Sequence, residues 1–188
     1  MPLSDLLDSI GEESINIMFK KFSCSHEKDL ENFLLYRAIR YEKEFLGRTF
    51  LLVDFDVHKN QTPNIAAYYT LANTSIDLFQ MGQNKKKRIM GEFPNRNALS
   101  NFPAFLIGQL GRDDKYSHND ISGETLLNCC VSQLKTAACI IGGKLIVLEC
   151  RQHMFDRVYA NLGFNKMTES PSEDGLYMLY KRVDFSLC

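Results

Sequence analysis

Gln109-Leu-Gly-Arg-Asp-Asp-Lys-Tyr-Ser-His-Asn-Asp-Ile-Ser-Gly-Glu-Thr-Leu-Leu127 is the most informative segment of the sequence. An apolar run at 104–107 leads into it, and a long amphipathic segment follows it. A strand that passes through a polar loop into a helix presents unpaired backbone N–H groups at the positive end of the helix dipole. The pattern therefore predicts an anion cradle made by backbone N–H groups of Ser117, His118, Asn119, Asp120, Ile121, Ser122 and Gly123.

The loop also contains features that count for and against such a cradle. Ser122 is a suitable N-cap, and Gly123 permits close approach of a ligand. Asn119 and Asp120 tolerate the left-handed backbone conformations that a nest-like loop needs. The carboxylates of Asp120 and Glu124 would repel a phosphate unless they point away from it. An ordinary strand-to-helix connection that binds nothing is the alternative.

A second segment follows downstream: an apolar strand at 145–148, then a short helix that ends in Val158-Tyr-Ala-Asn-Leu-Gly-Phe164. Tyr159 borders the apolar face of that helix, so packing in the core is one interpretation. The other is that its phenol points into a cleft and gives a proton to a leaving group. The sequence leaves both open.

The bulk properties limit the class of protein. A length of 188 residues predicts a single domain, 1–188, with 1–13 as an N-terminal extension. The formal net charge of −1 gives no general attraction to nucleic acid or membrane. No apolar stretch approaches the roughly 20 residues that span a bilayer, and the N-terminus lacks a signal-like pattern. We therefore expect a cytoplasmic protein with reduced thiols and, without C-x-x-C spacing, no metal.

Periodicity along the chain predicts an α/β fold with a mixed sheet and helices on both faces. The central strand, helix and strand should form a parallel pair with a right-handed crossover. We expect strands at 15–22, 49–57, 65–71, 104–112, 144–149, 166–170 and 176–182, helices at 25–45, 122–141 and 154–162, and a long loop at 80–101.

Three other patterns have a chemical and a plainer interpretation. Polar and apolar residues alternate in Asp54-Phe-Asp-Val-His58, which places three polar side chains on one face of a strand. These side chains could hold a metal ion, or they could form a solvated sheet face. Cys150 and His153 resemble a thiol–imidazole pair without a third partner, which favours a structural role. Lys85-Lys-Lys-Arg88 reads as a solvated charge run unless the substrate is a nucleic acid.

The 109–127 segment together with Tyr159-Ala-Asn-Leu-Gly-Phe164 resembles the GNAT superfamily of N-acetyltransferases over roughly residues 15–182. Ala67-Tyr-Tyr-Thr-Leu71 and Phe105-Leu-Ile-Gly-Gln-Leu-Gly-Arg-Asp113 are similar to the toxin-type acetyltransferases of toxin–antitoxin modules. The resemblance implies a mostly antiparallel central sheet with one splayed parallel pair.

The resemblance also implies acetyl-CoA as cosubstrate. Its pantetheine arm would bind the backbone at Leu110, Gly111 and Arg112, and its pyrophosphate the N–H groups from Ser117 to Gly123. An uncharged primary amine would attack the thioester directly, and Tyr159 would protonate the departing thiolate. Glu149, water and the substrate itself are the alternatives for the general base. An antitoxin and a homodimer are the further partners that this family suggests, with no membrane partner.

Two classes of function remain open. One is an acetyl-CoA-dependent N-acetyltransferase whose acceptor is aminoacyl-tRNA, a small amine or a protein. The other, motivated by Asp120 and Glu124, is a binding or regulatory module that keeps the GNAT fold without efficient catalysis.

Overall fold

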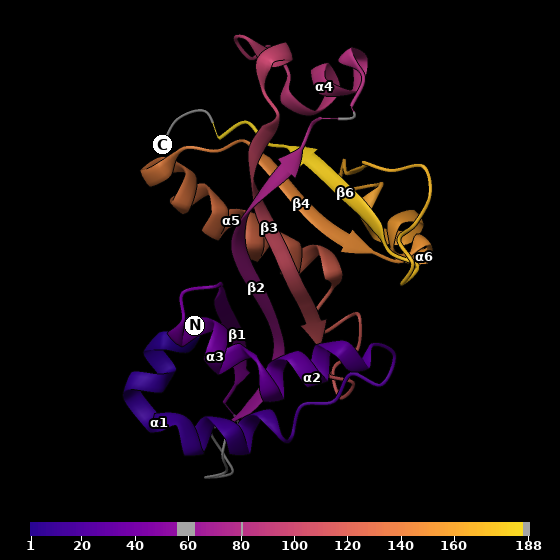
Figure 1. Ribbon diagram of the computed structural model, residues 1–188. Coiled ribbons are helices and arrows are strands. Elements are labelled where there is room, and N and C mark those ends of the chain that lie inside the picture. The colour runs from indigo at the N-terminus through magenta and orange to yellow at the C-terminus, as the bar shows by residue number, and fades with distance from the viewer. Residues whose placement is uncertain (56–62, 80, 186–188) are drawn as a thin grey trace. The chain divides into compact units, whose positions relative to one another are not determined.

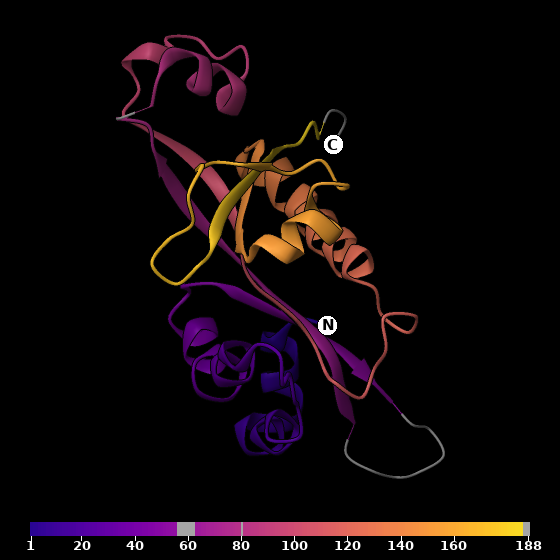
Figure 2. The same ribbon diagram turned by 90° about the vertical axis from the view of Figure 1, so that its right-hand side faces the viewer.

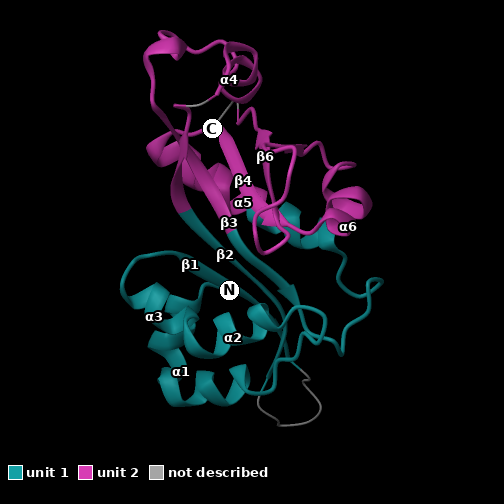
Figure 3. Ribbon diagram, turned by 45° about the vertical axis from the view of Figure 1, so that its right-hand side comes forward, with its two compact units in different colours: residues 1–72, 108–130 teal, residues 73–107, 131–188 magenta. Residues whose placement is uncertain are grey.

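The computed structural model describes residues 1–55, 63–79 and 81–185. Two compact units make up the chain (Figure 3): unit 1 contains residues 1–72 and 108–130, and unit 2 contains 73–107 and 131–188. Each unit is described by itself below. The expectation of a single domain stays a prediction.

The strands of the described residues form one mixed sheet, as expected, in the order β1-β2-β3-β4-β6-β5. The pair β3–β4 is parallel, whereas β1–β2, β4–β6 and β5–β6 are antiparallel. The fold is therefore α/β and GNAT-like. The strands are β1 (Arg48–Asp54), β2 (Asn64–Asp77), β3 (Asn101–Arg112), β4 (Leu145–Cys150), β5 (Asn165–Lys166) and β6 (Tyr177–Arg182).

Helices connect these strands and differ widely in length. The longest is the 19-residue α5, which directly follows the loop after β3. The helices are α1 (Leu3–Phe19), α2 (Lys28–Tyr36), α3 (Ala38–Lys43), α4 (Gln83–Met90), α5 (Gly123–Ile141) and α6 (Gln152–Met154), with a short 3-10 turn η1 (Arg96–Ala98) and a π-helical turn η2 (Phe155–Tyr159).

The core of unit 1 lies between its three N-terminal helices and the hairpin β1–β2. Figure 1 and Figure 2 both show α1, α2 and α3 grouped beside this hairpin. Tyr68 of β2 lies at the centre, fully buried, with its ring parallel to that of Phe33 and edge-on to that of Phe22. Its hydroxyl donates to the carbonyl of Leu30 at 2.7 Å, which satisfies the one polar atom of the ring in this core.

The core of unit 2 forms where α4 packs on strand residues. Ile89 and Met90 of α4 are fully buried in one hydrophobic cluster with Leu145 and Val147 of β4. Phe102 of β3 belongs to the same cluster. This packing explains why the residues at 80–101 are not the long loop that we expected. Lys86, Ile89 and Met90 are buried at the i, i+3, i+4 spacing of a helix, too few positions to show as periodicity.

The expected strand at 15–22 is also wrong, because these residues continue α1 to Phe19. Ile15, Met18 and Phe19 are buried at helical spacing, while Ile17, read as part of an alternating pattern, is 53% exposed. The helix bends at Gly11, so the N-terminal extension and the expected strand are parts of one kinked helix.

The helix expected at 25–45 is divided and begins later. α2 starts at Lys28, with Glu27 rather than Ser25 at the N-cap position, and Arg37 separates it from α3. Ser25 lies two residues before this N-cap, and its N–H donates to the carboxylate of Asp114. α3 ends at Lys43, with Glu44 at its C-cap position.

The remaining elements form near their expected positions, although β2, expected to end at residue 71, continues to Asp77. The hairpin β1–β2, the central β3–α5–β4 unit and the C-terminal strands all form, although the helix expected at 154–162 is only α6 with the turn η2. Cys24, Cys129, Cys130 and Cys150 are free thiols, whereas Cys139, expected to be reduced, is disulfide-bonded. Among the described residues, no helix is both long enough and apolar enough to cross a bilayer.

The turn from α5 to β4 provides a test of the packing in unit 2. Gly143 has a φ of +125°, and a Cβ there would lie 2.5 Å from the ring of Phe105. We expect Gly143→Ala to lower the free energy of unfolding by about 3 kcal/mol, since overpacking and left-handed strain each cost about 1–2 kcal/mol. Denaturant unfolding measures this.

Gly142→Ala is the matched control, because Gly142 also has a positive φ but a Cβ there meets no atom within 4 Å. It should lose only the strain, about 1 kcal/mol. Equal losses in the two variants would show that Phe105 does not restrict this turn.

Candidate functional site

The end of β3 supplies the strand part of the predicted cofactor site in unit 1. Parallel pairing with β4 covers Phe105, Leu106 and Ile107, and β3 then continues to Arg112. Leu110 and Arg112, two residues apart, present their backbone groups to the same edge of the strand. These are the groups predicted to bind the pantetheine arm.

Gly111 lies between them and allows unit 1 to pack closely at this point. A Cβ at residue 111 would lie 3.1 Å from the ring of Tyr68 and 3.2 Å from a methyl group of Leu30. Any larger residue would push the strand away from α2, so Gly111 sets the position of the predicted cofactor strand.

The loop after β3 is braced by its own side chains. Asp120 accepts hydrogen bonds from the N–H and the hydroxyl of Ser117, both at 2.7 Å. The Ser117 carbonyl in turn accepts from the N–H groups of Asp120 (3.2 Å) and Ile121 (3.1 Å). Hydrogen bonds from Ser117 and the positive charge of Arg112 lower the pKa of Asp120. The carboxylate expected to repel a phosphate is thus directed into the loop.

The other N–H groups of the predicted cradle are free. Within the described residues, the N–H groups of His118, Asn119, Ser122 and Gly123 have no hydrogen-bond partner. The cradle therefore consists of donors in use, at Ser117, Asp120 and Ile121, and donors still open.

Two side chains fix the end of the loop where α5 begins. The Ser122 hydroxyl accepts the N–H of Thr125 at 3.0 Å, as expected of an N-cap, and is 2.9 Å from the Thr125 hydroxyl. The guanidinium of Arg112 donates to the carbonyl of Ile121 at 2.6 Å. The open N–H donors of Ser122 and Gly123 thus lie at a helix N-terminus whose position is fixed by these hydrogen bonds.

A groove of about 680 Å³ runs beside this loop within unit 1. One wall carries a hydrogen bond of 2.8 Å from the Tyr116 hydroxyl to Asp54. Burial, together with that carboxylate, raises the pKa of Tyr116 to about 12, so the phenol stays protonated and keeps the hydrogen bond. The lining is otherwise mostly apolar: Met1, Leu51, Leu52, Val53, Asp54, Phe55, Ala66, Tyr116, Asp120 and Ile121.

Tyr159 lies in unit 2 at the end of the π-helical turn η2. It is 7% exposed and meets the ring of Phe164 edge-on at 5.6 Å. Its carbonyl accepts from the N–H groups of Leu162 and Phe164, which turns the chain back toward β5. The ring is therefore part of the core, as the plainer interpretation has it. Single π-helical turns are also frequent at functional sites.

Two other candidates in unit 2 differ in their surroundings. Glu149, one of the alternatives for the base, is exposed on β4 opposite Met178. Cys150 is buried, and burial raises the pKa of its thiol to about 11. A thiol that remains protonated at neutral pH is a poor nucleophile, so Cys150 fits the structural role rather than a pair with His153.

The alternating pattern at 54–58 contains no metal site in the part that the structure describes. In the described ranges, no group of three His, Cys, Asp or Glu side chains is arranged to hold a metal ion. Asp54 instead accepts from Tyr116. Asp56 and His58 of the same alternating pattern lie outside the described residues.

The basic run at 85–88 lies on α4 and is not a uniform charged face. Lys86 is buried, with its ammonium 3.5 Å from the carbonyl of Leu99. Lys87 is 3.5 Å from Glu92, and Arg88 is exposed. The sequence suggested four solvent-exposed cationic side chains, but one of them, Lys86, is buried and belongs to the packing of unit 2.

Sequence reasoning missed the tethers of the loop in unit 1, which include Tyr116 with Asp54 and Asp113 with Ser23. Their partners are separated by 62 and 90 positions. The one local signal was a run of two acidic residues directly after an apolar strand.

Comparison with solved structures shows a shared fold. A KacT variant with a tyrosine replaced by phenylalanine has 22% sequence identity and a TM-score of 0.66, over 85% of each chain. AtaT in complex with acetyl-methionyl-tRNAfMet has 20% identity and a TM-score of 0.63, over 87% of this chain and 86% of AtaT. An AtaT variant with a tyrosine replaced by phenylalanine, bound to acetyl-CoA and to the C-terminus of the antitoxin AtaR, has 19% identity and a TM-score of 0.60, over 87% of this chain and 84% of AtaT.

These matches confirm the GNAT-like fold that the sequence resemblance implied. No family model matches the sequence, and no curated protein matches it either.

Proposed function

We propose that this protein is an acetyl-CoA-dependent N-acetyltransferase. The observation that carries the proposal is the set of open N–H donors at His118, Asn119, Ser122 and Gly123, at the start of a 19-residue helix. Such donors suit a pyrophosphate. The fold adds support, since AtaT, with a similar structure, was solved with acetyl-CoA.

The proposed reaction is a direct transfer. The lone pair of an uncharged amine attacks the thioester carbonyl carbon, the C–N bond forms, and the C–S bond breaks. The amine loses a proton to water or to a base, for which Glu149 remains a candidate. Tyr159 donates a proton to the departing thiolate, which leaves as free CoA. Backbone groups at Leu110, Gly111 and Arg112 bind the pantetheine arm, and the loop donors bind the pyrophosphate.

Aminoacyl-tRNA is the acceptor that the comparisons favour, because AtaT was solved with acetyl-methionyl-tRNAfMet. An antitoxin is a proposed partner on the same basis, since AtaT was solved with AtaR and KacTA with DNA. A small amine and a protein amine remain the alternatives for the acceptor. A homodimer and a cytoplasmic location remain predictions from the sequence.

Tyr159→Phe tests the proton donor. The variant removes one hydroxyl from a packed ring, so we expect kcat to fall about 100-fold with acetyl-CoA affinity unchanged. Thiol release from acetyl-CoA gives kcat, with charged tRNA, amines and peptides as acceptors. Tyr180→Phe is the control, because Tyr180 is also buried in unit 2 and has no proposed role. Equal turnover in the Tyr159→Phe variant and the wild type would remove Tyr159 from the mechanism.

A binding or regulatory module is the second candidate. It is favoured by the engagement of Ser117 with Asp120, which already occupies part of the cradle. Calorimetry separates the candidates: enzymes typically have KM values of about 1 μM to 1 mM, so an enzyme should give a measurable heat of binding at millimolar acetyl-CoA. No heat of binding at millimolar acetyl-CoA would support the module.

The residues of the basic run that are not buried provide a test of the tRNA acceptor. We expect Lys85→Gln, Lys87→Gln and Arg88→Gln together to weaken tRNA binding and to reduce its salt slope by up to about 0.9 per lost phosphate contact. Lys86 is left in place because it is buried. Filter binding over a salt series measures both effects.

A matched triple variant, Lys20→Gln, Lys21→Gln and Arg37→Gln, removes the same charge from exposed positions of unit 1. It should leave the slope nearly unchanged. If both triple variants reduce the salt slope of tRNA binding equally, the effect comes from the overall charge of the protein, and α4 makes no specific contact with tRNA.

A further inference from the structure

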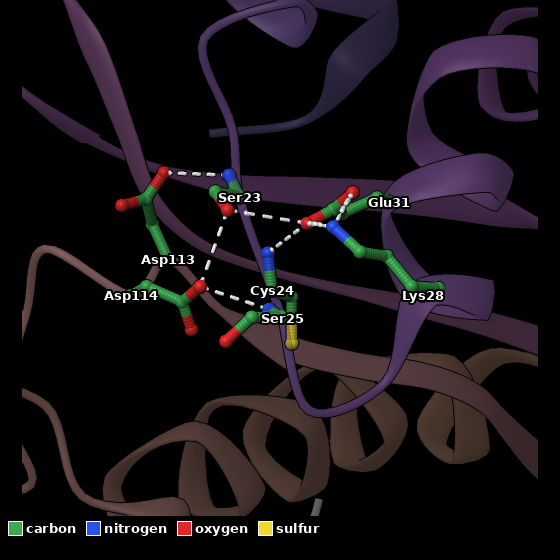
Figure 4. Close-up of polar contacts among 7 residues, drawn as sticks. All are labelled: Ser23, Cys24, Ser25, Lys28, Glu31, Asp113 and Asp114. Atoms are coloured by element: carbon green, nitrogen blue, oxygen red, sulfur yellow. Dashed lines mark hydrogen bonds and ion pairs between the residues drawn. The ribbon is translucent and has the colours of Figure 1, made fainter.

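Asp113, the first residue after β3, has a buried carboxylate held entirely by backbone donors. It is 2% exposed. One oxygen accepts the N–H of Ser23 at 3.0 Å (Figure 4). The other accepts the N–H of Lys115 at 2.8 Å. A buried carboxylate is costly unless it is hydrogen-bonded. The two oxygens therefore fix Ser23 and Lys115 on either side of one side chain.

The backbone next to this carboxylate is tied to the same segment. The Asp114 N–H donates to the Ser23 carbonyl at 2.8 Å. The Asp114 carboxylate accepts the Ser25 N–H at 2.8 Å and the Ser23 hydroxyl at 3.1 Å (Figure 4). These hydrogen bonds, chiefly that from the Ser25 N–H, lower the pKa of Asp114. Residues 113–114 and 23–25 thus form one hydrogen-bonded junction.

The Ser23–Ser25 segment is itself held from α2, which makes the junction rigid on that side. Glu31 accepts the Cys24 N–H at 2.5 Å and the Ser23 hydroxyl at 3.2 Å. Lys28 donates to both oxygens of Glu31. The N–H groups of three consecutive residues, 23 to 25, are therefore each used by a different carboxylate.

The junction lies at the beginning of the predicted cofactor loop. The Asp113 N–H also donates to the carbonyl of Ala66 in β2 at 3.0 Å, and Tyr116 holds Asp54 of β1. The open donors begin two residues later, at His118. The start of the loop is thus attached at three places in unit 1, while the donors beyond it have no backbone partner of their own.

We propose that Asp113 is a positioning residue, which sets the loop so that its open N–H groups meet the pyrophosphate of acetyl-CoA. This inference rests on the proposed function. Asp113 does not touch the cofactor, and it acts through the backbone of residues 115–123.

Asp113→Asn is the first test. The amide keeps one acceptor oxygen, but its NH2 group faces a backbone N–H that has lost its acceptor, and the negative charge disappears. We expect acetyl-CoA affinity to fall roughly tenfold, the effect of one charge-assisted hydrogen bond. Affinity for S-acetylpantetheine, which has no pyrophosphate, should change less than twofold. Calorimetry with the two ligands gives the ratio between the loss of affinity for acetyl-CoA and the loss of affinity for S-acetylpantetheine.

Glu42→Gln is the matched control. Glu42 is also a buried carboxylate of unit 1 that accepts a backbone N–H, from Thr49 at 2.9 Å, and it pairs with Arg48. A loss of general stability would weaken both ligands equally in both variants. Asp114→Asn is the milder second variant. Both hydrogen bonds of this exposed carboxylate end on one oxygen, which an amide can keep, so the variant removes the charge and should show the same difference between the two ligands to a smaller degree.

Hydrogen exchange of the unliganded proteins separates this inference from the proposed function. Asp113→Asn should speed exchange of the hydrogen-bonded amides of the loop, at Tyr116, Ser117, Asp120 and Ile121, at least tenfold, and Glu42→Gln should not. Wild-type protein that binds no acetyl-CoA would refute the proposed function, while exchange would still decide on Asp113. Unchanged loop exchange, or equal loss of affinity for both ligands, would overturn the positioning role.

Discussion

A loop that offers its backbone N–H groups to a ligand cannot use those groups to hold itself together, and this constraint shapes unit 1. Between β3 and α5 the open donors at His118, Asn119, Ser122 and Gly123 contribute nothing to the free loop. Its order must come from elsewhere, and side chains supply it: Asp113 and Tyr116 at its start, and Arg112 at its end. The carboxylate of Asp120, first an argument against phosphate binding, also supplies part of this support through its hydrogen bonds with Ser117.

The sequence predicted the parts of the fold whose signals are local. The 104–127 segment and the strand that follows it each combine an apolar run with a clear cap or stop, and β3, α5 and β4 form where expected. The prediction of a strand at 15–22 was wrong because a short apolar run fits both the two-residue period of a strand and the 3.6-residue period of a helix. Tertiary contacts favoured the helix. The helix α4 was missed because three buried positions, one of them a lysine, give too weak a pattern.

The candidate site was predictable in its donors but not in its supports. Ser122 as a cap and the N–H groups near it follow from residue type and position. That Asp120 turns inward to Ser117, or that Asp113 binds Ser23, depends on segments brought together by folding. Tyr159 is an intermediate case: its place at the end of a helix was foreseen, whereas the π-helical turn that carries it has no signature in the sequence. Its chemical role stays a prediction.

The bond between Asp120 and Ser117 means that the loop carries a substitute for its own ligand. A carboxylate already holds one donor that a phosphate oxygen would otherwise take. The empty loop is therefore preorganised, which lowers the entropic cost of binding. The same contact acts as an internal competitor, so apparent affinity is the intrinsic affinity reduced by the fraction of time that Asp120 stays in place. On the proposed function, the chain would thus exchange some strength of cofactor binding for a loop that keeps its shape without the cofactor.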